Sequence, residues 1–412
     1  MVKFAVWLRD IVGEGVGEMN VESRVCLSKA SELVLANDLS HLSAPSFVDL
    51  FCGGGLVRLG LNHRWSCELA VDWDETKEQA YKSLWGDEAF ERADVSQVSG
   101  AKIKAGIDLV WASFPCQDLS LAGTRRGLSG SRSGYFWSVI ELIRKAKSRG
   151  AKPKILAFEN VPGFVSQKGG DEFASAIRAI TELGYACTAV VLDAKHFVPQ
   201  SRPRVFILGV DSHELGRSGV TDDAPNWLYP NYLLRALSAS GLNESPDWFW
   251  LASDLPPMRS LSLTELMDWQ AEETLWDDEK QTRALLSLLS PLHRSKLEAV
   301  ISSGQRKVLG VYRRMRPTEG GKNIQRAEIS FNDHAGCLRA PTGGSSRQKF
   351  LFVEGKAIKS RLPSPSELCA IMGVQTEKFA GLSYNQIYRV FGEGVCPPVV
   401  KYLDDIFFKK IL

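Results

Sequence analysis

The sequence lacks the features that would place it among membrane, secreted or metal-binding proteins. Its 412 residues contain no apolar run of about 20 residues, the length needed to cross a bilayer. The short apolar stretch at the N-terminus is interrupted by Arg9 and Asp10, which is not typical of a secretory signal. The eight cysteines form no Cys-x-x-Cys pair, so we expect no metal site and no disulfide framework. Free thiols are typical of a reducing compartment, and we therefore expect a cytoplasmic protein.

Net charge is also nearly absent, at +2, so the chain as a whole is not an obvious binder of polyanions. The charge is unevenly distributed, however. Residues 211–279 are rich in acids, whereas residues 280–326 carry eleven Lys and Arg side chains against only Glu298 and Glu319. The basic segment is either a surface that contacts phosphates or a solvated charged helix plus loop, and the sequence leaves both interpretations open.

From Ser46 onward, short apolar segments alternate with amphipathic ones, and no internal repeat or low-complexity tract occurs. This alternation predicts an α/β fold with a doubly wound, Rossmann-like parallel sheet, whose strand-end loops bind ligands. The predicted strands are 46–51, 65–72, 107–114, 152–161, 186–194 and 204–210. The predicted helices are 56–61, 73–86, 135–150, 172–185, 364–373 and 396–411.

A glycine-rich turn, Phe51-Cys52-Gly53-Gly54-Gly55, follows the first strand and opens a helix. Glycines there let a ligand approach the backbone, although many strand-to-helix turns hold glycines without binding anything. Asp72, at the end of the second strand, is placed to hold ribose hydroxyls, and Trp73 beside it is placed to stack on an adenine. The alternative is a surface carboxylate beside a half-buried tryptophan.

Asp94 follows the next helix and is either an acceptor for an adenine amino group or a turn cap.

Cys116 lies where an apolar strand ends and a polar loop begins, in Ser113-Phe114-Pro115-Cys116-Gln117. A structural cysteine would be expected inside the apolar run. Pro115 stiffens the approach, and a thiolate at this exposed edge is a strong nucleophile. The alternative is an inert loop thiol.

Three further side chains are predicted to share that edge. Glu159 closes the next strand, where an acid next to apolar surroundings can hold a proton near neutral pH. Arg202 and Arg204 precede another strand, and their guanidinium groups are suited to a ring carbonyl oxygen. Their alternatives are a carboxylate that caps a turn and arginines on the surface or on phosphate.

These motifs together resemble the DNA (cytosine-5-)-methyltransferase family of the bacterial and phage type. The matching blocks, in family order, are DLFCGGG, VDWD, ADVSQ, SFPCQDLSLAG, FENVPGF, QSRPR, RAPTGGSSR and VFGEGVCPPVV. The resemblance covers the chain from about Ser46 to its end, and it is specific because several blocks recur in one order.

The resemblance implies S-adenosyl-L-methionine as cofactor, S-adenosyl-L-homocysteine as product and double-stranded DNA as partner. It also implies a monomer, whereas the lack of a long apolar run implies no membrane association. Whether a restriction endonuclease acts on the same site is a question that the sequence does not decide. The implied cofactor-binding residues are Phe51, Gly53, Gly55, Asp72, Trp73, Asp94, Pro115, Glu393 and Val395. The implied catalytic residues are Cys116 as nucleophile, Glu159 on N3 and the amine, Arg204 on O2, and Arg202 in support.

The resemblance also divides the chain. Residues 1–45 are an N-terminal extension, 46–210 a catalytic domain, 211–335 a smaller target-recognition domain, and 336–412 a return to the catalytic domain. Residues 120–135 match a mobile loop that closes over a flipped base. Two alternatives keep the core, namely an enzyme acting on RNA and a catalytically silent DNA-binding relative.

The sequence departs from the family pattern in three places. Leu56 replaces a common glycine, the N-terminal extension is longer than in compact members, and Glu393 stands where an asparagine is common. A carboxylate at position 393 would alter cofactor affinity or pair with a nearby base.

Overall fold

The structure is a computed structural model that describes residues 44–115, 134–214, 220–221, 224, 227–259, 261–318, 321–340 and 347–412. The chain divides into two units, Met1–Ala44 and Pro45–Leu412, and only the second is described below. Cys116, nearly all of the predicted N-terminal extension and most of the predicted mobile loop (120–135) lie outside the described residues. No helix in the described part of the chain is long and apolar enough to cross a membrane.

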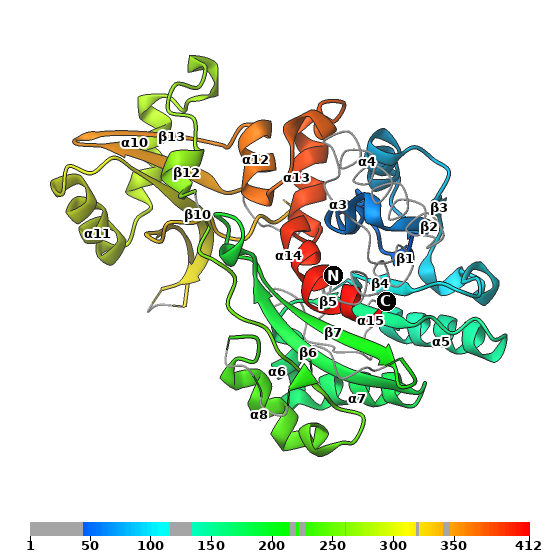
Figure 1. Ribbon diagram of the computed structural model, residues 1–412. Coiled ribbons are helices and arrows are strands. Elements are labelled where there is room, and N and C mark those ends of the chain that lie inside the picture. Colours follow the sequence, from blue (N-terminus) through cyan, green and yellow to red (C-terminus); the bar gives the residue numbers. More distant parts are fainter. Residues whose placement is uncertain are drawn as a thin grey trace, which may run out of the picture. The chain divides into compact units, whose positions relative to one another are not determined.

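A seven-stranded sheet forms the larger part of the second unit, with strand order β3-β2-β1-β4-β5-β7-β6 (Figure 1). Its strands are β1 Ser46–Leu50, β2 Ser66–Asp72, β3 Phe90–Arg92, β4 Leu109–Ala112, β5 Ile155–Asn160, β6 Tyr185–Asp193 and β7 Pro203–Asp211. The central strands are buried along nearly their whole length, as expected for strands covered by helices on both faces. The predicted α/β sheet is confirmed.

The prediction that all of its strands run parallel is wrong at one strand. β7 pairs antiparallel with both β5 and β6. Only residues 194–202 join β6 to β7, which is too few for the crossover helix that parallel neighbours need. The strand therefore turns back beside its predecessor. This places the start of β7, where Arg204 lies, beside the end of β5, where Glu159 lies.

Helices surround this sheet, and most of them bury an apolar face (Figure 1). Those that precede residue 241 are α3 Leu56–Leu61, α4 Glu75–Trp85, α5 Gly134–Ser148, α6 Gly163–Ser166, α7 Asp171–Thr181 and α8 Asn231–Ser240. Those near the C-terminus are α12 Pro365–Met372, α13 Tyr384–Glu393, α14 Pro397–Leu403 and α15 Lys409–Ile411. Helix α14 contacts α3, so the last segment of the chain packs on the first strand–helix unit.

The segment after β7 first packs on the large sheet. Leu228, Leu233 and Phe249 belong to the main core, and the Val191 amide donates to the Leu228 carbonyl at 2.8 Å. A short two-stranded sheet, β8 Val220–Thr221 with β9 Trp250–Leu251, lies in this segment.

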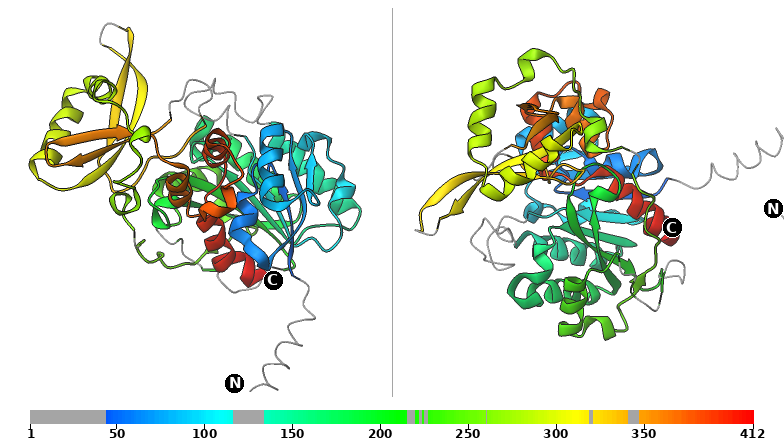
Figure 2. Two further views of the ribbon diagram at one scale, coloured as in Figure 1. Left: turned by 90° about the horizontal axis from the view of Figure 1, so that it is seen from above. Right: turned by 90° about the vertical axis from the view of Figure 1, so that its left-hand side faces the viewer.

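A separate antiparallel sheet follows, with strand order β11-β10-β12-β13. Its strands are β10 Lys307–Pro317, β11 Asn323–Ser330, β12 Lys349–Glu354 and β13 Ala357–Arg361, and the helices beside it are α9 Leu263–Leu266, α10 Glu279–Ser287 and α11 Pro291–Ser302. It has a small core of its own that includes Leu285, Val311 and Ile329. The basic segment thus forms two helices and a strand hairpin, and the β10–β11 hairpin (yellow) extends beyond the rest of the sheet (Figure 2).

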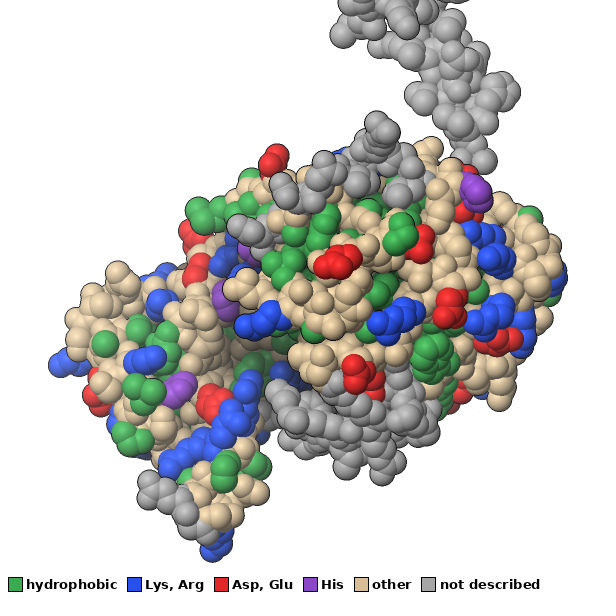
Figure 3. All heavy atoms as spheres, turned by 90° about the horizontal axis from the view of Figure 1, so that it is seen from below, with side chains coloured by type: hydrophobic (Ala, Val, Ile, Leu, Met, Phe, Trp, Pro, Cys, Tyr) green, Lys and Arg blue, Asp and Glu red, His purple; other side chains and the backbone are tan. Residues whose placement is uncertain are grey.

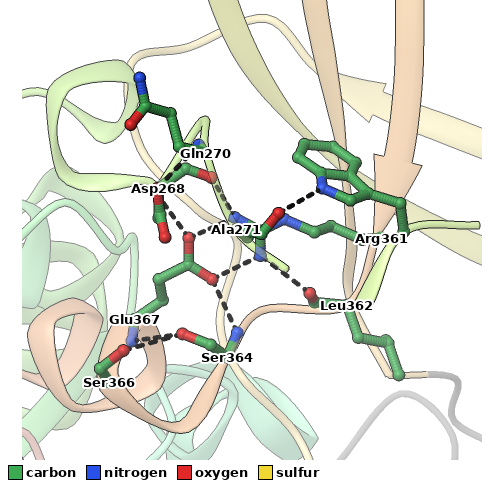
Figure 4. A network of polar contacts seen from close by, with 9 residues as sticks. Asp268, Gln270, Ala271, Arg361, Leu362, Ser364, Ser366 and Glu367 are labelled. Carbon is green, nitrogen blue, oxygen red and sulfur yellow. Dashed lines mark hydrogen bonds and ion pairs between the residues drawn. The ribbon is translucent and has the colours of Figure 1, made fainter. Parts of the chain in front are cut away.

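A buried ion pair fixes this sheet to α12 (Figure 4). Arg361, at the end of β13, is 0% exposed and Glu367 is 4% exposed, and both guanidinium nitrogens Nη1 and Nη2 lie 2.6 Å from the carboxylate oxygens of Glu367. Glu367 also accepts from the amides of Asp268 at 2.8 Å and Ser364 at 2.7 Å. The carboxylate oxygens of Glu367 each accept two hydrogen bonds, which offset part of the cost of burying the charges, and the pair holds three chain segments together.

Replacing Arg361 by Leu is expected to lower the free energy of unfolding by about 3–5 kcal/mol, because Glu367 would remain as an uncompensated buried charge. Urea denaturation followed by circular dichroism measures the change. Arg283→Leu is the control, since its pair with Glu279 is 70% and 80% exposed and should matter by less than about 1 kcal/mol. Equal effects of the two substitutions would contradict the structural role of the buried pair.

Candidate active site

Most of the predicted site residues that the structure describes lie where strands β1, β2, β4 and β5 end. Arg202 and Arg204 lie at the start of the antiparallel β7, Asp94 follows β3, and Glu393 and Val395 lie at the end of α13. The glycine-rich turn connects β1 to α3. Phe51, Gly53 and Gly55 all have positive φ, at 62°, 55° and 75°. A Cβ on Gly55 would lie 2.4 Å from Nε1 of Trp85, so only glycine fits there. Phe51 is held in a strained conformation that ordinary side chains avoid.

Asp72 stabilises this turn from the end of β2. Its carboxylate accepts from the Gly53 amide at 3.0 Å and from the Asp74 amide at 3.0 Å, and the residue is 2% exposed. The next residue, Trp73, is 63% exposed and presents a free aromatic face. The sequence thus places a fixed carboxylate and an exposed indole side by side.

Asp94 and Tyr135 link two loops near the turn. The Tyr135 hydroxyl donates to Asp94 at 3.0 Å, and its ring packs edge-on against Phe51 at 5.6 Å between centroids. Burial opposes the charge of Asp94, but hydrogen bonds from the Ser96 hydroxyl and amide and from Tyr135 lower its pKa below the ordinary value. Asp94 also caps the 3₁₀ turn that begins at Val95, as the capping alternative predicted.

Asp49, inside β1, is a buried carboxylate that the sequence analysis did not single out. It is 1% exposed, and neither of its oxygens has a hydrogen-bond partner among the described residues. Burial and the nearby Asp72 raise its pKa well above the ordinary value. A buried carboxylate without a donor is costly unless a ligand or a proton compensates it.

On the other side of the site, Glu159 and Arg204 form a buried ion pair. Nε of Arg204 lies 2.8 Å from Oε1 of Glu159, and both side chains are largely shielded from solvent. The antiparallel pairing of β5 with β7 brings them together. Predicted from separate motifs, these two residues are therefore neighbours in the structure.

Arg202 is buried and anchors the same edge to two distant segments. Its Nη1 donates to the Leu338 carbonyl at 2.8 Å, and its Nη2 donates to the Gly392 carbonyl at 3.0 Å. The guanidinium is thus fixed by a backbone carbonyl that directly precedes one C-terminal motif block and by another that lies inside the last block. Arg202 is 2% exposed and is therefore not a surface arginine, while its supporting role in catalysis stays a prediction.

Cys337 completes this cluster. It lies outside the motif blocks, and the sequence analysis did not identify it as a site residue. Its Sγ lies 3.1 Å from Nη1 of Arg202 and 4.0 Å from Nη2 of Arg204. Burial opposes the thiolate, but Arg202, Arg204 and Arg339 lower the pKa of Cys337 below the ordinary value. The site therefore contains a thiol that ionises more readily than most.

Glu393 is one of the departures from the family pattern, and it pairs with basic side chains, which is one of the two consequences expected for a carboxylate at this position. It lies 2.9 Å from Nζ of Lys77 and 3.8 Å from Nε of Arg389. Val395 is buried, and a Cβ on Gly394 would lie 2.5 Å from Cδ1 of Leu56, so this segment packs directly on α3 beside the glycine turn.

Cys116 lies outside the described residues, which end on this side at Pro115. The strand that leads to it is well fixed, because Nδ2 of Asn160 donates to the Phe114 carbonyl at 3.3 Å. Among the described residues, no group of three His, Cys, Asp or Glu side chains is placed to hold a metal ion.

The sequence profile of the C-5 cytosine-specific DNA methylases matches residues 45–408. The chain belongs to the C-5 cytosine-specific DNA methylase family.

Similar members of the family include two bacterial Type II methyltransferases. M.BsuFI of Bacillus subtilis is 31% identical over 166 residues, and M.HhaI of Haemophilus parahaemolyticus is 31% identical over 170 residues. The matched stretches cover 40% and 41% of this chain and 39% and 50% of those proteins, so the chain spans half or less of the length of these relatives.

Solved structures agree on the fold. The Entamoeba histolytica methyltransferase EhMeth has a TM-score of 0.60 at 14% identity and covers 90% of this chain and 100% of its own. The S. pombe Dnmt2 methyltransferase has a TM-score of 0.54 at 15% identity and covers 89% of this chain and 99% of its own. The methylase fold therefore extends over nearly the whole chain.

The lowered pKa of Cys337 predicts a pH-dependent contribution to stability. Because the thiolate is favoured in the folded state, its contribution is complete above the unfolded pKa of about 8.5 and is lost as pH falls through the folded pKa. The difference in unfolding free energy between the wild type and Cys337→Ala should therefore be larger at about pH 9.5 than at about pH 7. Urea denaturation at both pH values measures it.

Cys187→Ala is the control for this prediction. Burial raises the pKa of Cys187, so the wild type loses stability relative to this variant as pH rises through the unfolded pKa. Equal pH dependence for the two variants would contradict the assignment of a thiolate to Cys337.

Proposed function

We propose that this family member transfers a methyl group from S-adenosyl-L-methionine to C5 of a cytosine that is flipped out of a short specific sequence in duplex DNA. The observation that carries the proposal is the buried Glu159–Arg204 ion pair, held by Arg202 beside the strand that leads to Cys116. A carboxylate and a guanidinium, fixed together at a sheet edge, match the N3 and O2 edge of a cytosine.

The proposed reaction assigns one task to each residue. The Cys116 thiolate adds to C6, which makes C5 nucleophilic. Glu159 holds the proton at N3 and contacts the exocyclic amine, while Arg204 stabilises the charge that develops at O2. Arg202 keeps Arg204 and the neighbouring backbone in place. After methyl transfer, loss of the C5 proton and of the Cys116 sulfur restores the ring.

The residues on the other side fit a cationic, nucleotide-like cofactor, which supplies the methyl group when bound. The turn formed by Phe51, Gly53 and Gly55 leaves the backbone accessible, and Asp49 is a buried carboxylate that either a cationic ligand or a proton would compensate. We assign the ribose side to Asp72 and the adenine side to Trp73 and Asp94. Pro115, Glu393 and Val395 complete this set.

The β10–β11 hairpin is proposed to contact DNA. Lys and Arg side chains gather along the projecting hairpin on the face shown in Figure 3. Arg314 lies opposite Arg326 in the strand register, and Arg316 pairs with Glu328 at 2.9 Å. A two-stranded ribbon of this kind fits the major groove, and its charges suit phosphates. This favours duplex DNA over RNA as substrate.

Other properties follow from the same proposal. The enzyme acts as a monomer in the cytoplasm of a bacterium or a phage-infected cell. A restriction endonuclease that cuts the same sequence is a proposed partner.

Cys116→Ala is expected to abolish methyl transfer and to leave DNA binding intact, because only the nucleophile is lost. The measurement is bisulfite sequencing of unmethylated plasmid after incubation with S-adenosyl-L-methionine, with a gel-shift assay on the same DNA. Protection clustered in one short motif for the wild type, and none for the variant, is the expected result. No protection by folded wild type would favour the RNA substrate or the silent DNA-binding relative.

Glu159→Gln is expected to lower kcat by about 10²–10⁴-fold with little change in affinity for S-adenosyl-L-methionine, since the amide cannot transfer a proton. Single-turnover methylation rates and cofactor titration measure the two effects. The matched control is Glu172→Gln, a buried carboxylate on α7 that is assigned no part in the reaction. A normal rate for Glu159→Gln would remove Glu159 from the mechanism.

A further inference from the structure

Lys77 lies between the two carboxylates of the proposed cofactor side. Its Nζ is 2.9 Å from Oε2 of Glu393 and 3.6 Å from Oδ2 of Asp72. Lys77 is on α4, Asp72 ends β2 and Glu393 ends α13, so one ammonium group joins three elements. The Asp72 oxygen that faces Lys77 also accepts from the amide of Gly53 in the glycine turn.

These three side chains are not equivalent in their access to a ligand. Asp72 is 2% exposed, whereas the side chains of Lys77 and Glu393 are 19% and 33% exposed. Of the two carboxylates that flank Lys77, Asp72 is therefore the buried one and Glu393 is the one that solvent or a ligand can reach. Burial opposes the charge of Lys77, but Asp72 and Glu393 raise its pKa, so the ammonium stays charged between them.

A second pair joins the same group of charges. Nη2 of Arg389 lies 2.5 Å from Oδ2 of Asp74, and Nε of Arg389 lies 3.8 Å from Glu393. The cluster of Asp72, Asp74, Glu393, Lys77 and Arg389 thus has three negative and two positive charges. Its single negative excess depends on Glu393, because an uncharged residue there would leave the cluster neutral.

We propose that Lys77 is a positioning residue that fixes the carboxylate of Glu393 at the cofactor site, and that this pair sets the preference for the cationic cofactor over its product. S-adenosyl-L-methionine carries a sulfonium charge that S-adenosyl-L-homocysteine lacks. A fixed negative excess therefore stabilises the cofactor more than the product and reduces product inhibition. This inference rests on the proposed function, because it takes S-adenosyl-L-methionine as the ligand of this site.

The pair allows a test in which two substitutions have opposite consequences. Glu393→Gln removes a negative charge and should weaken S-adenosyl-L-methionine binding by about three- to tenfold more than product binding, as expected for one unit charge on the order of 10 Å away. Lys77→Met removes a positive charge. It should weaken both ligands, because Lys77 also holds Asp72 and Glu393 in place. It should shift the preference toward S-adenosyl-L-methionine, because the cluster then carries one more uncompensated negative charge.

Isothermal titration of the full chain with each ligand gives the two dissociation constants and their ratio, without any need for turnover. Lys77→Arg should keep the wild-type ratio, because it keeps the charge. The matched control is Lys82→Met, which breaks a 2.9 Å pair with Glu78 on the same helix and should leave the ratio unchanged. Raising the salt concentration should reduce the shifts in both variants.

The outcomes distinguish a failure of the Lys77–Glu393 proposal from a failure of the proposed methyltransferase function. Ratios that move in opposite directions for Glu393→Gln and Lys77→Met support the proposal. Ratios that move together, or do not move, overturn it while leaving the methyltransferase assignment intact. Failure of the folded wild type to bind S-adenosyl-L-methionine at all would overturn the proposed function itself.

Discussion

The buried guanidinium of Arg202 is the interaction on which the base side of the site depends. A charge without solvent is tolerated only when strong acceptors surround it, and here the carbonyls of Leu338 and Gly392 and the sulfur of Cys337 provide them. Those acceptors come from segments more than a hundred residues away from Arg202. Their positions are therefore fixed relative to β7, and Arg204, two residues further along, is directed at Glu159.

On the cofactor side, pairing of carboxylates with neighbouring cations fixes the positions of the side chains in a comparable way. Three carboxylates near the ends of β1 and β2, Asp49, Asp72 and Asp74, would repel one another if left alone. Asp72 is stabilised by backbone amides and Lys77, and Asp74 by Arg389. Only Asp49 remains without a donor among the described residues, which leaves it as the acidic group to be compensated by a bound cation or a proton.

The sequence was sufficient for those parts of the site that depend on local order. Strand ends in a doubly wound sheet meet at one edge, so Phe51, Asp72 and Glu159 could be assigned to one site from their places after apolar runs. The antiparallel course of β7 was missed, because residues 204–210 read as a buried strand in either direction. The short connection from residue 194 to 202 was the one available signal, since it excludes a crossover helix.

The remaining features depend on contacts between distant segments, which no local pattern encodes. Lys77 looks like one of several lysines on an amphipathic helix, and it becomes distinctive only because Glu393 packs beside it. Cys337 is an ordinary thiol until folding brings two arginines to it. The β10–β11 hairpin was hidden because its exposed arginines interrupt the apolar alternation that identifies strands.

The end of α13 shows why the two sides of the site are not independent. The carbonyl of Gly392 accepts from Arg202 on the base side, and the adjacent Glu393 pairs with Lys77 on the cofactor side. A Cβ on Gly392 would lie 2.3 Å from the Ala340 amide nitrogen, so the backbone there has no room to shift. Two neighbouring residues at the end of a tightly packed helix thus belong to different halves of the site. The tight packing at Gly392 therefore fixes Glu393 and the anchor of Arg202 relative to each other.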